Sequence, residues 1–194
     1  MCAAEAGGRE AGDAVAGATV FLILMASLHV ISKSVTTPFK LPFLAYSDTY
    51  WEFMKVGIYA STISYLLLWA VRGKGYLVGL SACVLATVFS MFLYGYAISS
   101  FVGAPLSWRY SILSVLSASS ISEAMKAVIY LGVMLGLTWV SGLIGSYVGV
   151  KAERFRDSDP LTAVGLVSYS LLLWLSIIST YVGPPPPLFT APQH

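Results

Sequence analysis

The chain has 194 residues, of which 57% are hydrophobic and 10% charged, and its formal net charge is +2. Soluble domains carry roughly 25% charged residues, so this chain has too little polar surface for a water-soluble globule of its size. Its few basic residues form no stripe, so the electrostatic footprint of a nucleic-acid-binding protein is missing. The composition predicts that the main partner of the protein is the lipid bilayer.

Five apolar segments are long enough to cross a bilayer as helices, which takes about 20 residues. They cover residues 15–35, 50–71, 76–102, 121–150 and 160–182. We therefore predict an all-α, polytopic membrane protein with five transmembrane helices in a single domain over residues 15–183. Residues 1–14 are expected to form a flexible tail, and the Pro-rich residues 184–194 an extended one, because proline disfavours a helix.

The short loops between these segments indicate an orientation. One loop carries Arg72 and Lys74, and another carries Lys151, Arg154 and Arg156. Both lie on the same side of a five-span protein, and the positive-inside rule assigns that side to the cytoplasm. We expect a multi-pass protein of the cell membrane with its N-terminus inside and its C-terminus outside. The bias is modest, at six basic residues inside against five outside.

Parts of the chain repeat. AISSFVGAPL at 97–106 returns as IISTYVGPPP at 177–186, and WEFMKVGIY at 51–59 returns as SEAMKAVIY at 122–130. The chain is therefore interpreted as two repeated helical hairpins plus a leading span. Hairpins related by an axis along the membrane normal are a known transporter plan, although purely structural membrane proteins also contain repeats.

Two Glu/Lys pairs are the most specific polar feature of the repeat. Glu52 and Lys55 are three residues apart, as are Glu123 and Lys126, so the members of each pair are neighbours on one helix. Each pair lies at the outer end of its expected span. One interpretation is an interfacial ion pair with a snorkelling lysine. The other is a charged rim, formed by both pairs around an outer mouth.

His29 lies near the middle of the first apolar segment. An ionisable side chain at that depth is a candidate functional residue, and a neutral histidine bonded across helices is the structural alternative. The cysteines, Cys2 and Cys83, form no CxxC motif and no ligand cluster. No metal or cofactor is therefore expected.

Small residues recur at four-residue spacing in the fourth segment, as Gly132, Gly136, Gly145 and Gly149. This spacing lets helix backbones approach closely, either within the chain or against another subunit. The segment 106–122 is expected to be a helix in the plane of the membrane or a plain loop. The chain has no Asn and one Gln, a depletion typical of proteins from thermophiles.

Two functions follow from these features. The first is a small permease or channel-like transport module of unknown cargo, oligomeric, with Ser, Thr and Tyr side chains along its route. The alternative is a non-catalytic structural or assembly subunit among other membrane subunits, which the small loops and Gly-rich faces favour. A membrane enzyme ranks third, because the sequence contains no HExxH, GxSxG or GxxxxGK[ST] motif.

Overall fold

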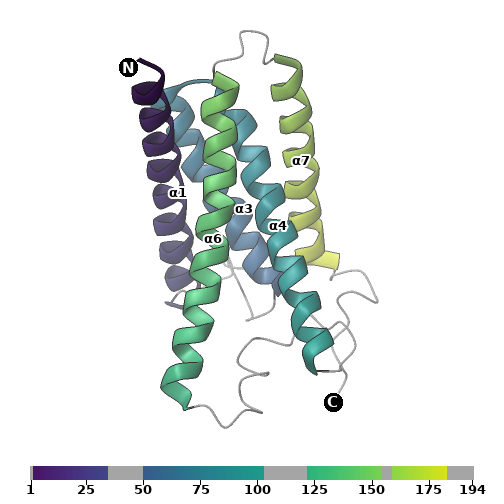
Figure 1. The fold of residues 1–194 in the computed structure, drawn as a ribbon. Helices are drawn as coiled ribbons and strands as arrows, with labels where there is room; N and C mark the ends of the chain where they lie inside the picture. Colours follow the sequence, from purple (N-terminus) through teal and green to yellow (C-terminus); the bar gives the residue numbers. More distant parts are fainter. Residues whose placement is uncertain (1, 35–49, 103–121, 154–158, 183–194) are drawn as a thin grey trace.

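The computed structural model describes residues 2–34, 50–102, 122–153 and 159–182. This described part consists of five helices: α1 (Cys2–Ser34), α3 (Tyr50–Arg72), α4 (Gly75–Val102), α6 (Glu123–Glu153) and α7 (Asp159–Val182). Figure 1 shows them side by side, with neighbours in sequence running in opposite directions. The predicted all-α class is confirmed. The Pro-rich tail and residues 106–121 of the expected interfacial segment lie outside the described residues.

Three helical stretches in the described part are long and apolar enough to cross a membrane. They are Gly7–Ile31 in α1, Met54–Arg72 in α3 and Pro160–Ile178 in α7. A shorter apolar stretch, Gly75–Met91, lies in α4. Three of the five expected spans therefore coincide with helices that have the length and hydropathy of a membrane span.

Four of the helices form a closed ring. α1 packs against α3 and α6, and α4 packs against the same two helices from the opposite side. α7 packs against α4 outside this ring (Figure 1). Large apolar side chains on α7 consequently remain uncovered, such as Val164 at 66% and Trp174 at 63% exposure. The buried apolar core lies inside the ring and includes Phe21, Met25, Val56, Tyr65, Leu80 and Val84.

α1 begins earlier than expected. It starts at Cys2, so residues 2–14, expected to be a flexible tail, belong to the same helix as the first apolar segment. Two ion pairs connect this part of α1 to the ring: Asp13 with Arg72 at 2.5 Å, and Glu10 with Lys151 at 2.9 Å. Asp13 and Arg72 are largely exposed, and pairs of this kind contribute about 0–1 kcal/mol. Glu10 is only 12% exposed, so its pair with Lys151 is partly buried.

The tight turn between α3 and α4 lies at the same end of the ring. Gly73 adopts a φ of +126° and donates its amide to the Trp69 carbonyl at 3.1 Å, which ends α3 in a conformation that favours glycine. The Glu153 carboxylate, at the end of α6, accepts the amide of Gly75 at the start of α4. A carboxylate at a helix N-terminus is stabilising, because it satisfies a free amide and opposes the helix dipole.

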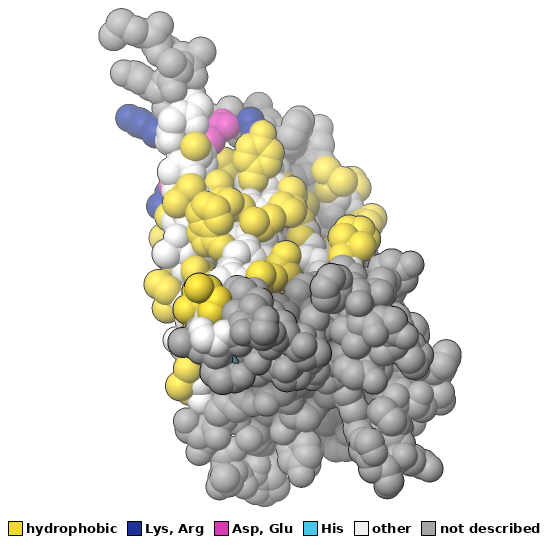
Figure 2. All heavy atoms as spheres, turned by 60° about the horizontal axis from the view of Figure 1, so that its bottom comes forward, with side chains coloured by type: hydrophobic (Ala, Val, Ile, Leu, Met, Phe, Trp, Pro, Cys, Tyr) yellow, Lys and Arg dark blue, Asp and Glu magenta, His cyan; other side chains and the backbone are white. Residues whose placement is uncertain are grey.

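We call this end of the ring, defined by Glu10, Asp13, Arg72, Lys151 and Glu153, the charged end. Figure 2 shows acidic and basic side chains gathered near one end of an otherwise apolar described surface.

Glycines set the distance between α4 and α6. A Cβ atom on Gly79 would lie 2.6 Å from the Gly145 carbonyl oxygen, and one on Gly145 would lie 2.8 Å from the Gly79 carbonyl oxygen. Gly149 contacts Tyr76 of α4 one turn away. Only residues without side chains allow backbones to meet this closely. We call this region the glycine contact, defined by Gly79, Gly145 and Gly149.

The other two glycines singled out in the sequence occupy a different environment. Apart from the neighbouring backbone of α6 itself, no described atom lies within 4 Å of the position that a Cβ would take on Gly132 or Gly136. α6 therefore packs closely against α4 along its C-terminal half, while these two glycines are open among the described residues.

Adding one methyl group at each kind of glycine tests this difference. On Gly145 it would lie 2.5 Å from Cys83 Cβ, so Gly145→Ala should lower the free energy of unfolding by about 1–3 kcal/mol, the usual cost of overpacking. Gly136→Ala should leave it unchanged or raise it by up to about 1 kcal/mol, since alanine is the better helix former. Thermal unfolding in a mild detergent measures both, and equal effects would contradict the glycine contact.

Candidate functional site

The interior of the ring is lined by small polar side chains as well as apolar ones. Ser61, Ser64 and Tyr65 of α3, Cys83 and Thr87 of α4, and Ser146 of α6 are all buried. We call these six residues the interior polar cluster. Spacing on the helices explains their grouping, because residues four apart, such as Ser61 and Tyr65, lie on the same helix face.

Tyr65 is the centre of this cluster. Its side chain is 0% exposed, and its hydroxyl donates to the Gly142 carbonyl at 2.9 Å and lies 3.1 Å from the Ser146 hydroxyl oxygen. The phenolic oxygen of Tyr65 reaches the α6 backbone because Gly145 has no side chain, and a Cβ on Gly145 would collide with this oxygen. Tyr65 therefore joins α3 to α6 across the interior of the ring.

The other hydroxyl groups of the cluster bond mainly to their own helices. Ser61, Ser64 and Thr87 each donate to the carbonyl four residues earlier, at 2.8, 2.7 and 2.8 Å. Ser61 Oγ also lies 3.4 Å from Cys83 Sγ. Because these protons are used locally, the oxygens keep lone pairs that can accept a further hydrogen bond. The cluster thus offers hydrogen-bonding groups without a fixed charge.

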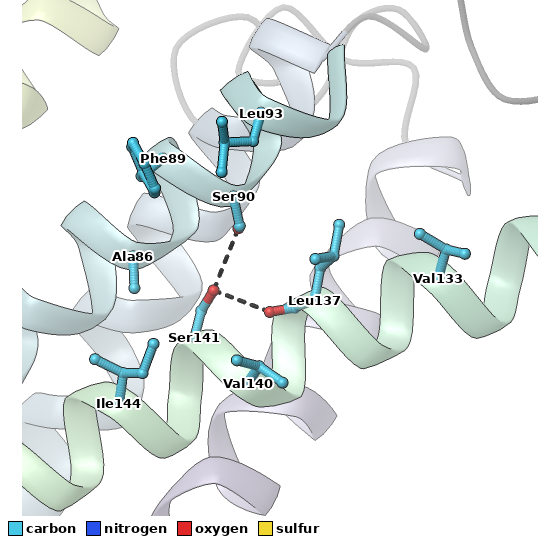
Figure 3. A pocket seen from close by; sticks show the side chains of 9 residues that line it. All are labelled: Ala86, Phe89, Ser90, Leu93, Val133, Leu137, Val140, Ser141 and Ile144. Carbon is cyan, nitrogen blue, oxygen red and sulfur yellow. Dashed lines mark hydrogen bonds between the residues drawn. The ribbon is translucent and has the colours of Figure 1, made fainter. Parts of the chain in front are cut away.

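A second feature is a hollow between α4 and α6 that opens on the outside of the ring (Figure 3). Its volume is about 380 Å³, which lies within the range of small-ligand pockets. The walls are almost entirely apolar. The lining residues are Ala86, Phe89, Ser90, Leu93, Val133, Leu137, Val140, Ser141 and Ile144.

Among the described residues of this lining, two serines form the only polar part. Ser90 donates to the Thr87 carbonyl at 3.0 Å, Ser141 donates to the Leu137 carbonyl at 2.9 Å, and their Oγ atoms lie 3.4 Å apart. Figure 3 shows the two side chains pointing toward each other from facing helices. The hollow also adjoins the interior polar cluster. Ser90 bonds to Thr87, which belongs to that cluster. On the other helix, Ser141 is followed by Gly142, whose carbonyl accepts the hydrogen bond from Tyr65.

The residues singled out in the sequence are distributed as follows. His29 lies on α1 with its Nδ1 atom buried. Lys55 lies on α3 and is 1% exposed. Its side chain is therefore buried among the helices, whereas one expectation was a snorkelling lysine. The side chains of Glu52, Glu123 and Lys126 lie outside those that the structure describes, so the charged rim stays a prediction.

The polar groups of the candidate site are mainly the hydroxyl groups of Ser, Thr and Tyr side chains. Among the residues that the structure describes, no group of three or more His, Cys, Asp or Glu side chains is arranged to hold a metal ion. Comparisons with protein-family models, with curated proteins and with solved structures find no match to this chain.

Sequence reasoning named Cys83, as a cysteine without a ligand cluster, but it singled out none of the individual hydroxyl residues of this site. The four-residue spacing of Ser61 and Tyr65 on α3, and of Cys83 and Thr87 on α4, is visible in the sequence. That spacing indicates a polar stripe on each helix. The spacing does not say which stripe faces which helix. The contact of Tyr65 with Ser146 depends on that arrangement of the helices.

A double-mutant cycle on Tyr65 and Ser146 tests the hydrogen bond across the ring. Tyr65→Phe and Ser146→Ala should each lower the free energy of unfolding by about 1 kcal/mol. Their coupling energy should be about 0.6 kcal/mol, the average for hydrogen bonds between membrane helices. Unfolding in mild detergent measures all four proteins.

Tyr147→Phe is the matched control for this cycle, because Tyr147 is on the same helix as Ser146 but 52% exposed. It keeps the ring that faces Lys151 Nζ at 5.5 Å and should be neutral. A Tyr65→Phe variant as stable as this control would rule out an energetic role for the Tyr65 hydroxyl.

Proposed function

We propose that this protein is an integral protein of the cell membrane with five spans, and that it acts as a small permease or channel-like transport module. The membrane location is supported by the three candidate spans and the apolar stretch in α4. It is also supported by the many large apolar side chains on the outside of the ring and of α7. Such a surface is stable when lipid covers it.

The proposed orientation has the charged end in the cytoplasm. Arg72 and Lys151 belong to this region, Lys74 lies in the adjoining turn between α3 and α4, and basic residues near the ends of spans favour the cytoplasmic side. The repeat is proposed as a trace of duplicated hairpins. If so, the copies have diverged in position, because α4 belongs to the ring whereas the equivalent α7 packs outside it.

The observation that carries the transport proposal is the interior polar cluster. It places hydroxyl groups from α3, α4 and α6 inside a ring of four helices, away from the apolar surface. Hydroxyl oxygens with spare lone pairs suit a small, uncharged polar solute. The Tyr65 hydroxyl is the proposed gate: it would release the Gly142 carbonyl and Ser146 and bond to the solute when α3 and α6 separate.

Solute flux tests this proposal. Vesicles containing the purified protein should swell faster in glycerol or urea than protein-free vesicles, as measured by stopped-flow light scattering. The double variant Ser61→Ala/Ser146→Ala should reduce the protein-dependent rate several-fold, because the solute loses two hydrogen-bonding partners. Ser168→Ala/Ser170→Ala on α7 is the control, since Ser168 bonds only to its own helix and Ser170 is exposed. A rate equal to that of protein-free vesicles would reject transport of these solutes.

The close packing of the ring favours a second function, that of a non-catalytic scaffold or assembly subunit. At the glycine contact the α4 and α6 backbones leave no room even for a methyl group, and rigid helix packing of this kind is what a scaffold needs.

Purification in a mild detergent separates the two functions. The transport module is expected to elute without foreign subunits, as the oligomer of this chain that the sequence predicts, because the proposed solute path needs no helices from another protein. Mass spectrometry and light scattering of the eluted particle determine its composition. Foreign membrane subunits in fixed stoichiometry would instead support the scaffold function.

A further inference from the structure

The hollow between α4 and α6 has a clear structural cause. The two helices are held together at the glycine contact, where their backbones touch. Further along, toward residues 90 and 141, serine and larger side chains replace the glycines on both helices, and the contact between them becomes the Ser90–Ser141 pair (Figure 3). The hollow occupies this second region, where the helices can no longer pack backbone against backbone.

The depth of the hollow limits what can reach it. It spans residues 86–93 of α4 and 133–144 of α6, near the middle of both helices. At 1.5 Å per residue, the α4 wall is about 12 Å long. If the helices cross the membrane as proposed, this wall lies within the hydrocarbon core of about 30 Å. A lipid headgroup stays at the surface, so only a hydrocarbon chain reaches this depth.

In the proposed membrane location, the mouth of the hollow also faces the hydrocarbon chains of the bilayer. Phe89, Leu93 and Ile144 are exposed apolar residues at its edge, and in the proposed membrane location lipid chains cover such a surface. A helix is about 10–12 Å wide with its side chains, too wide to enter between two helices that touch at Ser90 and Ser141. A single hydrocarbon chain is narrow enough.

We infer that this hollow is a binding site for one hydrocarbon chain of a membrane lipid, inserted between α4 and α6. The hydrophobic effect does not drive this binding, because the chain leaves one apolar medium for another. The gain comes from dispersion contacts with fixed walls that an empty hollow would lose. The site rests on the proposed membrane location and is independent of transport.

Photo-crosslinking in vesicles tests this site with the full chain. The probe is a phosphatidylcholine that carries a diazirine in the middle of one acyl chain. Adducts mapped by mass spectrometry should be several-fold more frequent on residues 86–93 and 133–144 than on the exposed α7 residues Val164 and Leu171. Labelling of the hollow should saturate as the mole fraction of probe rises, whereas labelling of α7 should rise linearly.

A matched pair of variants gives a second, independent readout. Ala86→Phe fills the hollow and should remove most of its adducts while leaving those on α7 unchanged. Ala163→Phe makes the same change on the exposed surface of α7 and should leave the hollow labelled. If Ala86→Phe does not yield folded protein, the saturation of labelling at the hollow in the wild-type protein decides whether the site exists.

Three results would overturn the inference. The first is equal, non-saturating labelling of the hollow and α7, which indicates only the surrounding bilayer. The second is stronger labelling by a probe with its diazirine on the headgroup. The third is a cross-link from Phe89→Cys to another copy of the chain, which places protein over the hollow. The absence of adducts anywhere, α7 included, would instead contradict the membrane location itself.

Discussion

The close approach of α4 and α6 at Gly79 and Gly145 is the contact on which the rest of the structure depends. Because no side chain separates the two backbones, the hydroxyl of Tyr65 can reach the α6 carbonyl at Gly142 and the Ser146 hydroxyl. The same contact brings α4 across the ring from α1, with α3 and α6 between them. Both candidate sites, the interior polar cluster and the hollow, are consequences of where this contact begins and ends.

The polarity of the molecule is arranged in an order suited to a bilayer. The hydroxyl groups of the interior polar cluster lie inside the ring, many large apolar side chains lie on its outside, and the described ion pairs lie at one end. Inside, most of the hydroxyls donate to their own helix four residues earlier, which allows a polar residue in a helix without leaving an unsatisfied donor. Tyr65 is different, because it is too long to bond to its own helix in this way and bonds across the ring instead. It therefore ties α3 to α6 through polar groups, while the weaker contact between Ser61 and Cys83 at 3.4 Å links α3 to α4.

Much of the fold could be predicted because it depends on properties local to each segment. The helices lie where apolar stretches of about 20 residues predicted them, and three of these stretches have the properties of a span. The start of α1 was missed, since Gly7, Gly8 and Gly12 disfavour a helix by their propensity alone. Its ion pairs with Arg72 and Lys151, 59 and 141 residues away in the chain, oppose that local preference. Lys55 illustrates the same limit, because its burial depends on neighbours that spacing along one helix cannot reveal.

The sequence by itself therefore determined the helical class, the membrane location expected of the chain and the clustering of basic residues in two short loops. Each of these follows from the composition and length of individual segments. Only the tertiary structure decided which glycines touch another helix, which hydroxyls face one another and where a hollow remains. The physical reason is that helix faces toward lipid and helix faces toward protein are both apolar in a membrane protein. Hydropathy cannot distinguish them, and the side of α6 that holds Gly145 and Ser146 is known only once α3 and α4 are packed against it.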